Sequence, residues 1–127
     1  MRTGVVIALA LLAVIVAAGI WSGMTVEALS TRYYSAAREV EILVEKEAWG
    51  RAAEVTDAYL DTWRDTVPWL QMLINHEDAD EVTLALVTLQ AGIKAKEQAT
   101  CYEACSLLRE NAQHLYHRDA FTPGNVL

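Results

Sequence analysis

The chain has 127 residues, in which 17 Asp and Glu outnumber 10 Lys and Arg and give a formal net charge of −7. This acidic balance argues against binding to nucleic acid, which needs a basic surface, and against docking on anionic lipid headgroups. Beside the apolar N-terminus there is room for one small domain of about 100 residues, and the absence of low-complexity sequence indicates that this domain is folded.

The first element is an apolar segment, residues 5–20, without a charged or polar side chain. As a helix it spans roughly 24 Å, and the flanking residues 3–4 and 21–24 extend it to about 30 Å, the hydrocarbon thickness of a bilayer. Trp21 stands where an interfacial aromatic residue belongs. We therefore expect residues 1–24 to form a transmembrane anchor that contacts the membrane through residues 4–24.

A second interpretation of this segment is a cleaved secretory signal, since residues 16–18 (Val-Ala-Ala) form an acceptable cleavage site. The helical pattern continues past Trp21 without a break, which favours the uncleaved anchor. Arg2 precedes the segment, whereas the first basic residue after it is Arg32. The positive-inside rule then predicts a single-pass protein of the cell membrane, with a cytoplasmic N-terminus and an extracytoplasmic C-terminal domain.

The first helix of that domain, residues 25–46, is expected to continue the membrane span. Its buried face is marked by apolar residues three and four apart: Val26, Leu29, Tyr33, Ala36, Val40 and Leu43. The second helix, from near residue 48 to residue 74, carries a clearer stripe: Trp49, Ala52, Thr56, Tyr59, Trp63, Val67, Leu70 and Ile74. Pro68 removes a backbone donor inside it, which predicts a kink there. Beyond the kink the helix is apolar nearly all round, so it is either central in the bundle or covered by a partner.

Asp78, followed by Glu81, resembles a capping box and predicts a third helix over residues 79–95. Its core stripe is Val82, Ala85, Leu86, Leu89 and Ile93. The fourth helix is predicted over residues 97–117, with its buried face at Cys101, Cys105, Leu108, Ala112 and Leu115. Short connections favour antiparallel neighbours, so the predicted fold is all-α, with a transmembrane helix followed by an antiparallel bundle of about four helices over residues 25–127.

Cys101 and Cys105 lie one helical turn apart, a spacing that suits a disulfide poorly. We interpret them as small buried hydrophobic residues. The alternative is a metal site that they would share with His114 or His117.

His76, Glu77, Asp78 and Asp80 cluster in the predicted turn between the second and third helices. An imidazole beside carboxylates suits zinc or a hard cation, so His76, Glu77 and Asp80 are candidate metal ligands. The simpler interpretation is a helix start, where acidic residues favour the helix dipole. No combination of nucleophile and base is placed by the sequence, so we expect neither catalytic residues nor a cofactor.

Three sequence blocks resemble a family of small bacterial proteins known as domain of unknown function 4363, found mainly in spore-forming Gram-positive bacteria. They are E-x-W-x-x-A at Glu47, Trp49 and Ala52, the single Trp63, and W-L-x-x-L-I-x-H-E-x-x-D over residues 69–80. The resemblance implies a membrane-anchored helical domain without an assigned activity. It also strengthens the interpretation of His76, Glu77 and Asp80 as residues that act together.

The closing residues 124–127 resemble the N-I-L/F element of that family, and Val126 with Leu127 is expected to dock on the bundle. Pro68, the Asp78-Ala79 step and the two cysteines depart from the family pattern.

These features together predict a non-enzymatic membrane protein whose exported acidic bundle binds a membrane or cell-envelope protein, or a second copy of itself. The second and third helices carry more apolar surface than a domain of this size can bury. The residues expected to contact the partner are Trp69, Met72, Leu73, Leu84 and Val87. The alternative function is a metal- or ligand-binding sensor that uses the turn at residues 76–80.

Overall fold

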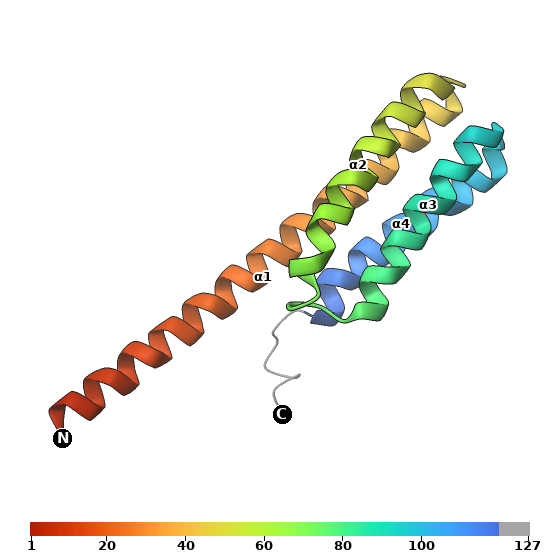
Figure 1. The fold of residues 1–127 in the computed structure, drawn as a ribbon. Helices are drawn as coiled ribbons and strands as arrows, with labels where there is room; N and C mark the ends of the chain where they lie inside the picture. Colours follow the sequence, from red (N-terminus) through yellow and green to blue (C-terminus); the bar gives the residue numbers. More distant parts are fainter. Residues whose placement is uncertain (120–127) are drawn as a thin grey trace.

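The structure, a computed structural model, describes residues 1–119. Within that range four helices follow one another: α1 (Arg2–Glu45), α2 (Trp49–Leu70), α3 (His76–Ala95) and α4 (Gln98–Asp119). Figure 1 shows the N-terminal half of α1 projecting alone from a bundle formed by the rest of α1 and the other helices. The predicted all-α class is confirmed, with a long apolar N-terminal helix that leads into a helical bundle.

α1 is an unbroken helix of 44 residues, about 66 Å long at 1.5 Å per residue. Its residues 1–21 are exposed, and within it lies a segment that is long and apolar enough to cross a membrane. Packing against the bundle begins at Val26, which is 4% exposed. Just before it, the Thr25 hydroxyl donates to the carbonyl oxygen of Trp21 at 2.8 Å. The prediction that the first bundle helix continues the N-terminal segment is confirmed.

The bundle places α4 between α1 and α3, while α2 lies against both α3 and α1. Successive helices run antiparallel, as the short connections predicted (Figure 1). The α1–α2 and α3–α4 connections therefore lie together at the end remote from the N-terminus, which we call the distal end. The α2–α3 connection lies at the proximal end, from which the N-terminal half of α1 projects.

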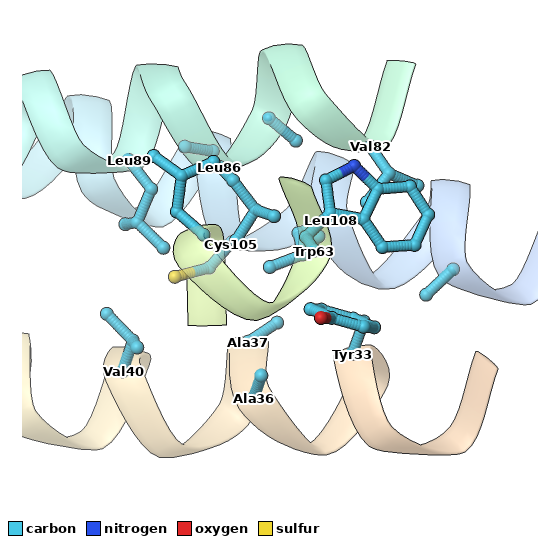
Figure 2. Close-up of a cluster of buried hydrophobic side chains, with 14 of the residues drawn as sticks. Tyr33, Ala36, Ala37, Val40, Trp63, Val82, Leu86, Leu89, Cys105 and Leu108 are labelled. Carbon is cyan, nitrogen blue, oxygen red and sulfur yellow. The ribbon is translucent and has the colours of Figure 1, made fainter. Parts of the chain in front are cut away.

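The core confirms the helical periodicity of the sequence. All the predicted core positions of α3 and α4 are at most 3% exposed: Val82, Ala85, Leu86, Leu89, Ile93, Cys101, Cys105, Leu108, Ala112 and Leu115. Trp63 of α2 is fully buried and meets the ring of Tyr33 edge to face, with 5.0 Å between the ring centroids (Figure 2). Its indole Nε1 donates to the Thr83 hydroxyl at 2.8 Å. One side chain of α2 thus contacts both α1 and α3.

The predicted extension of the second helix to residue 74 is wrong, because α2 ends at Leu70. Pro68 lies inside the helix and has no N–H to donate to the preceding turn. Two residues later the backbone tightens, with the Met72 amide donating to Trp69 and the Leu73 amide to Leu70 over three-residue steps. The chain then turns toward α3. The kink expected at Pro68 stays a prediction.

The predicted start of the third helix is also wrong, because α3 begins at His76 and its N-cap is Asn75. The Asn75 side chain accepts from the Glu77 amide at 3.0 Å. Asp78, expected to be the cap, lies inside the first turn and is 2% exposed. Both Asn and Asp satisfy the local chemistry of a cap, and burial of Asp78 within the bundle decides between them.

Replacing Asn75 by alanine is therefore expected to destabilise the bundle by about 1 kcal/mol, since an N-terminal amide of α3 loses its side-chain acceptor. The measurement is chemical unfolding of the full chain in detergent, followed by near-ultraviolet circular dichroism. Glu81→Ala is the matched control, because the capping box predicted for Asp78 and Glu81 does not form at this helix start. A larger loss for Glu81→Ala than for Asn75→Ala would contradict the observed cap.

The two distal connections end their helices in the same way. Glu47 and Lys96 adopt positive φ values of 57° and 55°, the left-handed conformation that closes a helix C-terminus. The Glu97 amide then donates to the carbonyl of Gly92 at 2.9 Å, which satisfies a terminal helix acceptor. The Gln98 side chain donates to the carbonyl of Val44 at 3.1 Å and so joins the two connections. The distal end is held by backbone and side-chain hydrogen bonds together.

Candidate functional site

The five predicted partner-binding residues lie in three separate places on the bundle. Trp69 and Met72 are 41% and 85% exposed at the proximal end, beside the half-buried Leu73. Leu84 is 66% exposed in a groove between α3 and α4. Val87 is half-buried in a different groove, between α2 and α3. The structure therefore gives three candidate contact surfaces in place of one continuous patch.

The α3–α4 groove has a volume of about 460 Å³ and is lined by residues 81–88 and 107–114, around the middle of the two helices. Two exposed leucines face it, Leu84 from α3 and Leu107 from α4, with exposed fractions of 66% and 43%. Glu81 and Glu110 also line it and give the groove an acidic character. Leu107 was not among the predicted contact residues. A leucine outside the buried stripe of α4 must face solvent or a partner, so its position in the sequence could have identified it.

The α2–α3 groove is larger, at about 820 Å³, and its lining includes the first residues of α2 and the last residues of α3, which puts it at the distal end. Its width follows from the small residues Gly50, Ala53 and Ala91, whose side chains leave space between the helices. Across this space the Gln90 amide donates to an Asp57 carboxylate oxygen at 2.8 Å. This hydrogen bond joins α2 to α3 and places a polar contact within the otherwise apolar lining of the groove.

Further polar contacts join α1 to its neighbours. The Tyr59 hydroxyl donates to a Glu39 carboxylate oxygen at 2.8 Å, and burial raises the pKa of that phenol. The guanidinium of Arg109 on α4 pairs with the carboxylate of Glu41 on α1, both being about one-quarter exposed. These contacts fasten α2 and α4 to α1 at its surface, which is a structural role.

The candidate metal ligands do not converge on a site in the part of the chain that the structure describes. His76, Glu77 and Asp80 are exposed, whereas Asp78 is buried. Among the side chains of residues 1–115, no group of three or more His, Cys, Asp or Glu is arranged to hold a metal ion. The turn is accounted for as the start of α3, where Glu77 and Asp78 favour the positive end of the helix dipole.

Both cysteines are free thiols within the core and are fully buried. Burial, together with the nearby carboxylate of Glu41, raises the pKa of Cys105 from 9.0 to about 12. Burial and Glu97 raise the pKa of Cys101 as well. A thiol that holds its proton is a poor nucleophile, and both side chains fill space in the core, as expected of small buried hydrophobic residues. The side chain of His117, which the alternative metal site included, lies outside the described residues.

These shifts predict a loss of stability in alkaline solution. The thiol of Cys105 and the phenol of Tyr33, whose pKa burial also raises to about 12, keep their protons in the folded chain. In the unfolded chain they ionise at lower pH, so the unfolded state binds fewer protons above about pH 9. Stability should be full below about pH 9 and fall as the pH rises toward about 12.

Thermal unfolding of the full chain across this pH range tests the expectation. In Cys105→Ala the decline should be shallower, because one of the groups that titrate differently in the two states is gone. An identical pH dependence for Cys105→Ala and the unchanged protein would contradict it.

A comparison with protein families gives one match, to the family described as Domain of unknown function (DUF4363), over residues 20–126. Neither the curated proteins nor the solved structures contain a match to this chain. The matched range covers the whole bundle and excludes most of the apolar segment of α1. The family-like closing residues 124–127, and the docking expected of Val126 and Leu127, lie outside the described residues.

Proposed function

We propose that this chain, which belongs to the DUF4363 family, is a non-enzymatic single-pass membrane protein whose exported bundle binds a membrane or cell-envelope protein. The observation that carries the proposal is the continuity of α1. One rigid helix joins a fully exposed apolar segment to the packed bundle, with no flexible linker between them. Such a helix holds the bundle at a fixed distance from the bilayer, where a partner in the same membrane can reach it.

The orientation follows from Arg2, which precedes the apolar segment and favours a cytoplasmic N-terminus. A cysteine introduced at Lys46, which is exposed at the distal end, should then react with a membrane-impermeant maleimide on intact cells. The native cysteines give little background because both are buried. Labelling that appears only after the cells are opened would reverse the orientation.

The α3–α4 groove is the surface that best supports protein binding. Exposed leucines from two helices line one concave surface, which is the form that receives the apolar face of an amphipathic helix. Its acidic residues Glu81 and Glu110 favour a partner helix flanked by Lys or Arg. The groove begins at Glu81, about 8 Å along α3 from its proximal end, so we place the partner helix outside the bilayer and close to it.

A photo-cross-linking amino acid placed at Leu84 in the full chain tests this assignment in native membranes. We expect one discrete adduct, which disappears when Leu107→Glu is introduced on the opposite wall of the groove. The matched control is the same cross-linker at Ile42, which is 43% exposed and outside the groove. An adduct at twice the mass of the chain would identify the partner as a second copy. Equal adducts from both positions, or none from Leu84, would remove the groove as the partner site.

A further inference from the structure

The proximal end of the bundle carries a group of apolar side chains that stand exposed among the residues that the structure describes, and we name it the proximal corner. It consists of the exposed Pro68, Trp69 and Met72 and the half-buried Leu73. Met72 is 85% exposed, the largest value for a big apolar side chain among residues 25–115. A second group of exposed apolar residues follows the membrane segment on α1, at Trp21 and Met24, which are 60% and 66% exposed.

The register between α1 and α2 brings these two groups to nearly the same height. Tyr33 contacts the rings of both Tyr59 and Trp63, at centroid distances of 6.0 and 5.0 Å, so it lies level with the middle of residues 59–63. From that level, 1.5 Å per residue puts Trp69 roughly 12 Å and Trp21 roughly 18 Å toward the projecting end of α1. The two indoles therefore differ in height by only about 6 Å. Met72 lies two residues past the end of α2, in the turn where its amide donates to the carbonyl of Trp69.

A height difference of this size matches the membrane interface. The polar headgroup region on one side of a bilayer is roughly 5–8 Å thick, and tryptophan is the residue enriched there. With Trp21 at the edge of the hydrocarbon, Trp69 falls within the headgroup layer, and Met72 adjoins it in the turn after α2. Their ring and thioether are apolar groups that this layer accommodates, and methionine adapts readily to irregular surroundings.

The negative charges near the proximal corner indicate which kind of lipid headgroup it can contact. Glu77 lies in the first turn of α3 and Asp80 in the second, both exposed and next to the proximal corner in the sequence. These carboxylates would be repelled by anionic headgroups, so the contact relies on apolar insertion into a zwitterionic surface. The same acidic residues keep the rest of the bundle in water.

From these observations we propose that the proximal corner rests in the interface of the bilayer that α1 spans. The inference rests on the proposed anchoring by α1 and adds a second point of contact, which fixes the rotation of the bundle about the α1 axis. A single helix leaves that rotation free, whereas a helix and a corner together present the α3–α4 groove in one direction along the membrane.

Tryptophan quenching by brominated lipids tests the proposal in the full chain. The protein is reconstituted in phosphatidylcholine vesicles whose acyl chains are brominated near the headgroups, and the emission is compared with that in unbrominated vesicles. Trp21→Phe serves as the background, leaving Trp49, Trp63 and Trp69. Trp63 is fully buried, and Trp49 begins α2 at the distal end, about 30 Å from Trp69 along that helix.

We expect Trp21→Phe to be quenched by the brominated lipid, and the quenching to fall severalfold when Trp69→Phe is added. Adding Trp49→Phe in place of Trp69→Phe should leave the emission intensity lost to brominated lipid unchanged. Met72→Asp offers a second variant, because a side chain this exposed can change without disturbing the fold. In the Trp21→Phe background it should at least halve the quenching, since a charge is moved into the interface.

The outcomes separate this proposal from the anchor on which it rests. Quenching of the unchanged protein that vanishes in Trp21→Phe would leave the anchor standing and overturn the contact by the corner. If brominated lipid quenched neither the unchanged protein nor Trp21→Phe, the proposed membrane anchor itself would be contradicted. Trp69 that is shielded from aqueous acrylamide yet not quenched by lipid would assign the corner to a protein partner or a second copy, against the proposal. Quenching of Trp21→Phe that persists fully with Met72→Asp would also count against it.

Discussion

Replacing Trp63 by alanine should destabilise the bundle by about 3–5 kcal/mol, the range for removing a fully buried large aromatic side chain. The loss combines a cavity at the meeting point of α1, α2 and α3 with the loss of the edge-to-face contact to Tyr33. It also removes the donor to the Thr83 hydroxyl.

The buried cysteines give a direct measurement of this loss. In the native state both thiols are inaccessible, so a thiol reagent labels them at a rate set by opening of the bundle. An opening free energy lower by 3–5 kcal/mol corresponds to labelling that is about 100- to 4,000-fold faster. Trp69→Ala is the matched control, because that indole is 41% exposed and should change the rate far less. Similar rates for the two variants would show that Trp63 is not a central core residue.

Two aspartates in the apolar segment should abolish membrane anchoring. Leu9 and Leu12 are 61% and 56% exposed and lie near the middle of residues 5–20. Each carboxylate at the centre of a membrane helix costs about 3 kcal/mol on the insertion scale, so Leu9→Asp/Leu12→Asp loses about 6 kcal/mol. Among the residues that the structure describes, none packs beside the segment to pair with these charges, since residues 1–21 are exposed.

The measurement is partition between membrane and soluble fractions after alkaline carbonate washing, with Met24→Asp as control. Met24 lies beyond Trp21, at the expected interface, where one carboxylate is tolerated. We expect the control to remain in the membrane and the double variant to leave it. The intact mass of the native protein must include residues 1–18, because a mass that lacks them would establish cleavage as a secretory signal.

The helices and their buried faces were largely predictable, because both depend on local periodicity. In α4 the residues Cys101, Cys105, Leu108, Ala112 and Leu115 recur at three- and four-residue steps, and all five are fully buried. A helix whose apolar residues lie on one stripe can bury them in only one orientation toward a core. The same reasoning located the core of α3, although its outer faces are also apolar.

Boundaries were less predictable where several residues satisfy the same local requirement. Asn75 and Asp78 can each cap a helix, and the sequence around Asp78 favours the second through Glu81. In the structure three further residues join α3, Asn75 is the cap, and Asp78 is 2% exposed within the first turn. A choice between two equally good caps is made by packing with other helices, which a single sequence window does not contain.

The sequence by itself determined that an apolar N-terminal helix leads into an all-α bundle, and which stripe of each bundle helix is buried. Tertiary structure alone decided how the remaining apolar residues are grouped. Leu84 and Leu107, 23 positions apart, face one groove, whereas Val87, only three positions from Leu84, lies in another. The physical reason is that such grouping depends on the register and spacing between helices. Gly92 shows this directly, because a Cβ there would lie 3.1 Å from the Cys101 sulfur, so only glycine gives α3 and α4 their present approach without a shift of the neighbouring atoms.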